Sequence, residues 1–135
     1  MSKDILKEKI ALELKRCDEF LEAAKSMIGG KFYSSAVSRA YYAVLHSARA
    51  LLLIVDIEPT THAGAVSMFG LHFVKTKEIE KKYGKIFKNL KEERETGDYD
   101  ITSEFGEDDA KEAIKEAEEF SAQMKAYLKS KDLKG

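Results

Sequence analysis

The sequence predicts an all-α protein, an antiparallel up-and-down bundle of four long helices plus one short helix. Three observations support this fold class. Apolar residues recur at steps of three and four along most of the 135 residues, which is the period of a helix that buries one face. The composition combines one Pro and eight Gly with 35% charged residues, a balance typical of helix-rich globular proteins. Four short breaks separate the periodic segments and suit loops between antiparallel neighbours.

The first two long helices are defined by an apolar stripe and by a breaker. The first helix is predicted over residues 3–28, which are followed by two glycines that favour a helix stop. The second is predicted to start near Tyr33 or Ser34, where a serine can cap free backbone N–H groups. It is expected to continue to about Val55, because residues 56–61 hold the only proline.

The remaining helices have weaker boundaries. A short third helix is predicted from Thr60 or Thr61, one of which can serve as its cap, to about Phe73. A fourth helix is predicted over residues 76–95 from one apolar stripe. The last helix is predicted after Gly106, because three acidic residues then fall in the first turn, where the helix dipole favours negative charge. All of these segments are expected to form one domain spanning residues 1–135.

The second helix carries Ala, Val, Leu or Tyr around its whole circumference, so it is predicted to be buried on all sides. Either the other helices or a second copy of the chain would cover it, and a homodimer is the economical explanation. Arg39 and His46 interrupt this helix seven residues apart, which places them about 10 Å apart on the face that also holds Tyr42.

These polar residues have two interpretations. In the structural one, Arg39 reaches an acidic residue or extends its charged head to the rim, and His46 is neutral and hydrogen-bonded within a packed interface. In the functional one, Arg39 binds phosphate oxygens in a fork and His46 exchanges protons near neutral pH. Tyr42 would then stack on a base or donate its hydroxyl.

Arg94 continues the apolar stripe of the fourth helix, so its head is predicted to point inward and to need a partner. Asp98, four residues later, is the nearest candidate. The structural alternative is an Arg94–Asp98 ion pair with Tyr99 packed beside it. The functional alternative makes Arg94 a second phosphate ligand near Arg39, with Asp98 holding its orientation.

Several other classes of function are excluded. His62 and His72 lie on different faces of a short helix without a third ligand, and Cys17 is the only cysteine, so no metal site is predicted. No glycine loop or nucleophile elbow is present, and no cofactor is expected. The longest apolar run, residues 50–55, falls far short of the roughly 18 residues of a membrane span. We therefore expect a cytoplasmic protein without a membrane partner.

Charge is unevenly distributed despite a net charge of −1. Residues 75–91 hold seven Lys and two Glu, and residues 92–119 hold thirteen acidic residues and three basic ones. The lysines could guide an RNA backbone, and they also fit a solvated helix face.

Three motifs together resemble one known family. They are SRAYYAVLHSARALLL at residues 38–53, THAGAVSMFGLHFVKT at 61–76 and RETGDY at 94–99. In this order they are similar to the HEPN domain, and more narrowly to a prokaryotic subgroup of that family. The resemblance implies a helical bundle of four or five helices that commonly dimerises.

The resemblance also implies function. Many HEPN domains are metal-independent endoribonucleases of toxin–antitoxin or defence systems, with an Arg and a His separated by four to six residues. Others are partners of a small nucleotidyltransferase. Arg39 and His46 fit the outer limit of that spacing, but Ala40 stands where the ribonucleases typically have Asn, Asp or His. We therefore expect a nucleotide- or nucleotidyltransferase-associated accessory subunit of a two-component system, with an endoribonuclease using Arg39 and His46, or a purely structural dimer, as alternatives.

Overall fold

The computed structural model describes residues 1–99 and 105–134, and the side chains of residues 97–99 lie outside this description. Its described part contains five α-helices and no strand. The helices are α1 (Lys3–Gly29), α2 (Tyr33–Leu52), α3 (His62–Phe69), α4 (Lys81–Tyr99) and α5 (Glu107–Ser130). A 3-10 turn, η1 (Leu53–Val55), extends α2, and a π-helical turn, η2 (Gly70–Val74), extends α3. The predicted all-α fold class is confirmed.

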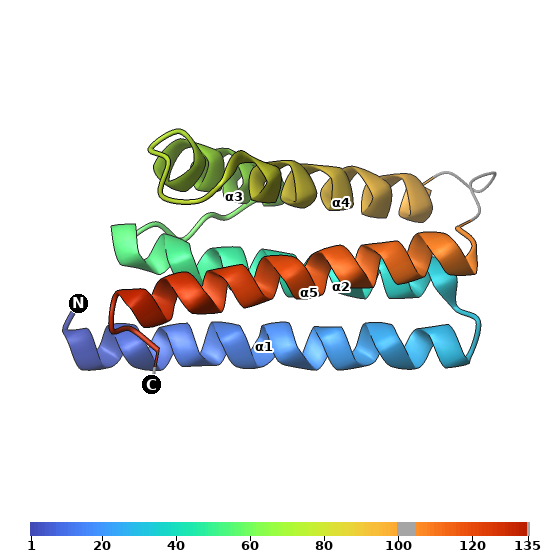
Figure 1. Ribbon diagram of the computed structural model, residues 1–135, viewed down its shortest axis with the longest axis horizontal. Coiled ribbons are helices and arrows are strands. Elements are labelled where there is room, and N and C mark those ends of the chain that lie inside the picture. The colour runs from blue at the N-terminus through green and yellow to red at the C-terminus, as the bar shows by residue number, and fades with distance from the viewer. Residues whose placement is uncertain (100–104, 135) are drawn as a thin grey trace.

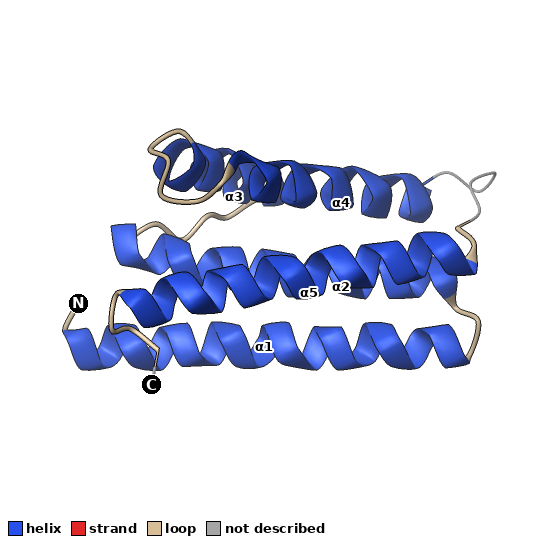
Figure 2. Cartoon of the chain, in the orientation of Figure 1, coloured by secondary structure: helices blue, strands red, loops and turns tan. Residues whose placement is uncertain are grey.

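The four long helices alternate in direction, and the short α3 precedes α4 at one end (Figure 1). Loops join them at the two ends of the bundle (Figure 2). α2 is central, because it contacts α1, α3, α4 and α5. None of the helices that the structure describes is both long and apolar enough to cross a membrane.

The expected burial of α2 is confirmed, except for a stripe of residues along one side of the helix. From Ala36 to Leu53 every residue is buried except four, which are half-buried: Arg39, Tyr42, His46 and Arg49. The chain's own helices supply this burial. It therefore requires no second copy, and the homodimer remains a prediction.

Two helix starts test the capping arguments. Thr61 caps α3 as predicted, since its hydroxyl accepts a hydrogen bond of 2.9 Å from the Gly64 amide. The prediction that a serine caps α2 is wrong. Phe32 occupies the cap position and makes no side-chain cap. Ser34 lies one position inside the first turn, where its hydroxyl cannot serve as the cap.

The fourth helix begins later than predicted, at Lys81 rather than near residue 76. Lys77 adopts the left-handed conformation with φ of 65°, which ends the preceding helical turn. Ile79 is nevertheless buried, so it contributes to the core from the loop and not from the helix. The apolar stripe predicted for this helix therefore included Ile79, which packs in the core but lies outside the helix.

Candidate functional site

The polar stripe of α2 consists of Arg39, Tyr42, His46 and Arg49, the only half-buried residues in an otherwise buried stretch. Steps of three, four and three residues keep them on one side of the helix. The site's backbone is therefore a rigid, fully packed helix. Arg39 and His46, predicted from the sequence, share this stripe and are not sealed inside the protein.

His46 is held by a carboxylate of α1. Its Nδ1–H donates a hydrogen bond of 2.8 Å to Glu13 Oε2, and the two side chains are 21% and 22% exposed. The Phe20 ring lies parallel to the imidazole, with centroids 5.5 Å apart and planes inclined by 10°. Arg49 Nε lies 3.8 Å from the other Glu13 oxygen. α1 thus fixes the orientation of the histidine.

A groove of about 720 Å³ lies beside His46. Its lining comes from α2 through His46 and otherwise from α1 through Leu12, Glu13, Lys15, Arg16 and Glu19. Lys15 and Arg16 make no ion pair with any residue that the structure describes. The groove therefore offers free cationic groups next to an accessible imidazole.

Three side chains from other helices pack against the ring of Tyr42. Phe20 stacks on its ring at 5.3 Å, and the Arg94 guanidinium lies over the ring at 5.2 Å from the centroid. His62 meets it edge-on at 5.9 Å. These neighbours use ring surface that a stacked base would need. The hydroxyl of Tyr42 is thus the better candidate for a ligand contact.

Arg94 points inward, as predicted, and lies over two tyrosines. Besides Tyr42, its guanidinium carbon is 5.8 Å from the ring centroid of Tyr41. The predicted partner Asp98 and the neighbouring Tyr99 have side chains outside the described residues. Arg94 is joined to α2 by cation–π contacts, which each contribute about 0.5–2 kcal/mol.

Arg39 lies one turn before Tyr42 on the same stripe and is half-buried. Among the residues that the structure describes, no acid pairs with its guanidinium and no hydrogen bond engages it. Of the two structural roles expected for Arg39, the acidic partner is therefore absent from the described part of the chain. An arginine of this kind is available for an anion.

His62 adds a polar group that sequence reasoning had assigned no role. It lies against Tyr41 at 5.5 Å. Burial lowers its pKa, and the nearby cations Arg94 and Lys91 lower that pKa further. At neutral pH this histidine is thus uncharged, although it borders a positively charged site. Burial similarly raises the pKa of Tyr41, whose hydroxyl finds no hydrogen-bond partner among the described residues.

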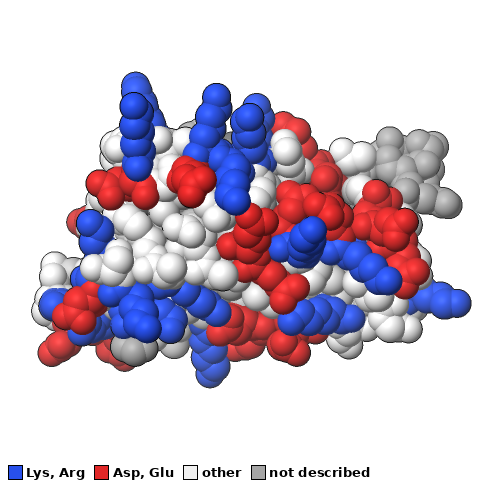
Figure 3. Space-filling view, viewed as in Figure 1, with Lys and Arg blue, Asp and Glu red and all other residues white. Residues whose placement is uncertain are grey.

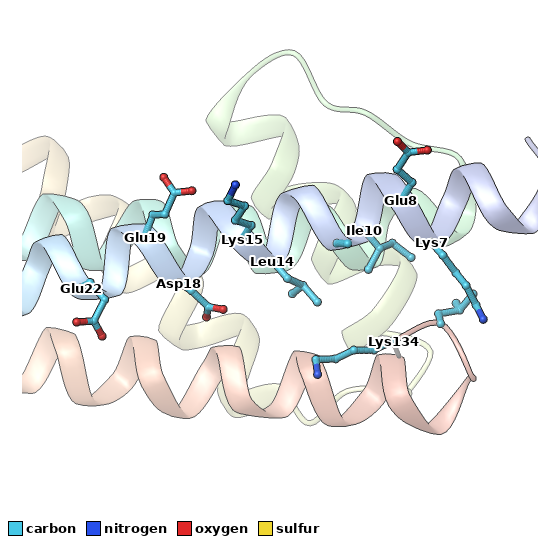
Figure 4. Close-up of a pocket in the computed structure, with 11 residues that line it drawn as sticks. Lys7, Glu8, Ile10, Leu14, Lys15, Asp18, Glu19, Glu22 and Lys134 are labelled. Atoms are coloured by element: carbon cyan, nitrogen blue, oxygen red, sulfur yellow. The ribbon is translucent and has the colours of Figure 1, made fainter.

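A larger hollow of about 940 Å³ lies between α1 and the C-terminal residues, and it shares Lys15 and Glu19 with the groove beside His46. Figure 4 shows Leu14 and Asp18 pointing toward α5, whereas Glu8, Lys15 and Glu19 point away from it. The charged groups of this hollow therefore do not converge on one point. None of the predicted site residues lines it.

The charge separation predicted from the sequence is visible on the surface. Lysine side chains project along the α3–α4 edge, and acidic side chains gather over α4 and α5 (Figure 3). Lys82 is paired with Glu119 at 2.7 Å, and Lys91 with Glu95. Only part of the lysine stripe is consequently free to attract an anion.

Sequence reasoning missed four residues of this site. Arg49 could have been found, because it continues the spacing of Arg39 and His46. Glu13 and Phe20 lie on α1, and His62 lies on α3. No spacing within the chain indicates which side of α1 or α3 faces α2.

Comparisons with known proteins place the chain among its relatives. The family model described as the HEPN domain matches residues 11–127. A Methanocaldococcus jannaschii protein named "Putative toxin MJ0605" is 43% identical over 96% of this chain and 95% of its own length. A second protein of that organism, also named a "Putative toxin", is 33% identical over 89% of this chain and 82% of its own. A Thermotoga maritima "UPF0332 protein" is 38% identical over 78% of this chain and 80% of its own.

Proposed function

Because the chain belongs to the HEPN domain family, we propose that it is the HEPN component of a two-component, toxin–antitoxin-like system. In this proposal the polar stripe of α2 binds a phosphate of RNA or of a nucleotide. The names of the two Methanocaldococcus jannaschii relatives support the assignment to such a system. A small nucleotidyltransferase is the expected protein partner, and the chain acts as a homodimer.

The observation that carries the proposal is the pairing of an available cation with an accessible imidazole on one rigid helix. Arg39 has no acidic partner among the described residues, and His46 is held at the edge of a groove. Arginine presents a fork of donors that matches phosphate oxygens, and a histidine can donate to phosphate or accept from a hydroxyl. A phosphate ester with a neighbouring hydroxyl satisfies both residues.

Thermal unfolding with added ligand tests this proposal. A nucleotide or short RNA that binds only the folded protein raises the midpoint temperature. We expect Arg39→Ala to abolish this shift while leaving the unliganded midpoint nearly unchanged. Lys129→Ala is the matched control, because it removes one positive charge from an exposed position on α5. No shift with any nucleotide, RNA or neighbouring gene product would sink the proposal.

The partners are tested separately. Light scattering after size exclusion should give the mass of two chains, since the exposed Leu12 beside His46 offers apolar surface to a second copy. If a small nucleotidyltransferase gene lies next to the gene of this chain, co-expression of the two should yield a stable complex. A monomer that does not bind the nucleotidyltransferase would contradict both proposed partners, the second copy and the nucleotidyltransferase.

The hydrogen bond between His46 and Glu13 favours a second candidate function, a metal-independent endoribonuclease. In this reaction His46 Nε2 takes the proton of a ribose 2′-hydroxyl, and the oxygen attacks the adjacent phosphorus. Arg39 stabilises the charge that develops on the phosphate oxygens. The bond to the 5′-oxygen breaks, that oxygen takes a proton from water, and a 2′,3′-cyclic phosphate remains.

This candidate makes a distinct prediction. RNA should be cleaved in the presence of a chelator and should carry cyclic phosphate ends. Arg39→Ala and His46→Ala should each abolish cleavage, because one removes the charge stabiliser and the other the base. Cleavage that survives both substitutions would remove these residues from the reaction.

A further inference from the structure

We propose that Glu13 is a positioning residue that fixes the tautomer of His46, so that Nε2 is the nitrogen offered to the ligand. This inference rests on the proposed function of the polar stripe, which it deepens. Neither the spacing of Arg39 and His46 nor the family match indicates which ring nitrogen is used. The hydrogen bond from α2 to α1 decides it.

The hydrogen bond has one chemical reading. An ionised carboxylate only accepts hydrogen bonds, so Nδ1, at 2.8 Å from Glu13 Oε2, must carry the proton. This holds for the neutral ring and for the imidazolium. Because Nδ1 keeps its proton in both forms, the neutral ring and the imidazolium differ only in the proton on Nε2.

Two further contacts keep this arrangement in place. Phe20 lies nearly parallel to the imidazole, so its flat surface limits tilting of the ring. Arg49 approaches the second oxygen of Glu13 at 3.8 Å. With side-chain exposures of 34% and 22%, this ion pair adds little stability. Its contribution is to hold the orientation of the carboxylate.

Because Nε2 is the nitrogen offered to the ligand, the tautomer of His46 determines which ligand groups it can bind. No hydrogen bond from the described part of the chain engages Nε2. An unprotonated Nε2 accepts a hydrogen bond from a hydroxyl, and a protonated one donates to a phosphate oxygen. A ribonucleotide chain presents both groups side by side, and DNA lacks the 2′-hydroxyl. Glu13 thereby favours RNA over DNA of the same sequence.

Nitrogen NMR of the histidine ring tests the tautomer directly. At a pH where His46 is neutral, the wild-type spectrum should show a protonated Nδ1 and an unprotonated Nε2, with the signals assigned through His46→Gln. Glu13→Gln should replace this by a mixture, because an amide can either accept from or donate to Nδ1. Glu13→Ala, which removes the partner altogether, should do the same.

The matched control is Glu19→Gln, which removes one negative charge from the same groove without touching the hydrogen bond. Its His46 signals should stay as in the wild type. A protonated Nε2 in the neutral wild type would overturn the proposal, as would an unchanged tautomer in both Glu13 variants.

Binding supplies the second readout. The wild type should bind RNA several-fold more tightly than DNA of the same sequence, and Glu13→Gln should lose that preference while Glu19→Gln retains it. A preference that survives in Glu13→Gln contradicts the positioning role. If the wild type binds neither nucleic acid, the proposed function fails, and the NMR result still decides whether Glu13 sets the tautomer.

Discussion

Cys17 lies on the core face of α1 and is fully buried. Burial raises the pKa of its thiol to about 11, and the opposing attraction of Lys125 only partly offsets this. The thiolate is the reactive form of cysteine, and this environment suppresses it. Cys17 is therefore a packing residue, as expected from a sequence that contains no second cysteine.

A thiol reagent checks this directly. At neutral pH the native protein should react very slowly, at a rate set by unfolding, because the thiol is both buried and protonated. The protein unfolded in urea should react at once and serves as the control. Rapid labelling of the folded protein would show that Cys17 is accessible.

At the level of single residues, much of the site was predictable. Arg39, Tyr42 and His46 lie on one helix, where 100° per residue determines which side chains share a face. Glu13 and Phe20 were not predictable, because their position depends on how α1 is rotated and shifted against α2. That register is set by packing over the whole bundle.

Among the elements, α4 and α5 meet at an acidic seam formed by Glu93, Asp109, Glu112 and Glu116. Burial raises the pKa of Glu93, and repulsion from Glu116 and the other carboxylates raises it further. Burial likewise raises the pKa of Glu116. This seam opposes the folded state at neutral pH, since its carboxylates repel one another and none of them forms an ion pair within the described part of the chain.

Glu93→Gln should thus stabilise the protein at neutral pH. A folded-state pKa above the ordinary 4.5 means that the folded protein holds the proton more tightly, so stability falls as pH rises through this window. The gain in midpoint temperature should be present at neutral pH and should fade once the pH falls below 4.5, where the carboxyl is protonated in both states. A gain that is equal at both pH values would point to a cause other than charge.

All five helices were predictable from the sequence, but the start of α4 was misplaced and the cap of α2 was wrong. Thr61 was predictable because a threonine followed three residues later by a glycine amide makes a local cap. The late start of α4 was not, because Lys77 adopts a left-handed conformation that lysine seldom takes. Ile79 is buried by tertiary contacts although it precedes the helix. Its place in the apolar stripe therefore made the predicted start of α4 too early.

In the whole molecule, an aromatic cluster joins α3 and α4 to α5. Phe120 of α5 lies 5.4 Å from Phe69, 5.9 Å from Phe87 and 6.1 Å from Tyr83, measured between ring centroids. Phe69, Phe87 and Phe120 are fully buried. This cluster fastens α3 and α4 to the bundle, and Arg94 and His62 depend on that attachment.

Phe120→Ala should therefore destabilise the fold by about 3–5 kcal/mol, the usual cost of deleting a buried aromatic ring. Urea unfolding measures it. Leu71→Ala, at a 46% exposed position of η2, is the control and should cost far less. Equal losses for both variants would contradict the central place of the cluster.

Titration with a labelled RNA measures whether the polar stripe of α2 binds the phosphate of RNA. The RNA should keep its 2′-hydroxyl groups, because His46 Nε2 is expected to contact one of them, and a gel run after the titration should show that the RNA is intact. Fluorescence anisotropy should report the dissociation constant. We expect saturable binding that weakens with added salt, with at least a tenfold loss in Arg39→Ala and wild-type affinity in Lys129→Ala. Equal affinity of the wild type and Arg39→Ala, or equal losses in both variants, would contradict it.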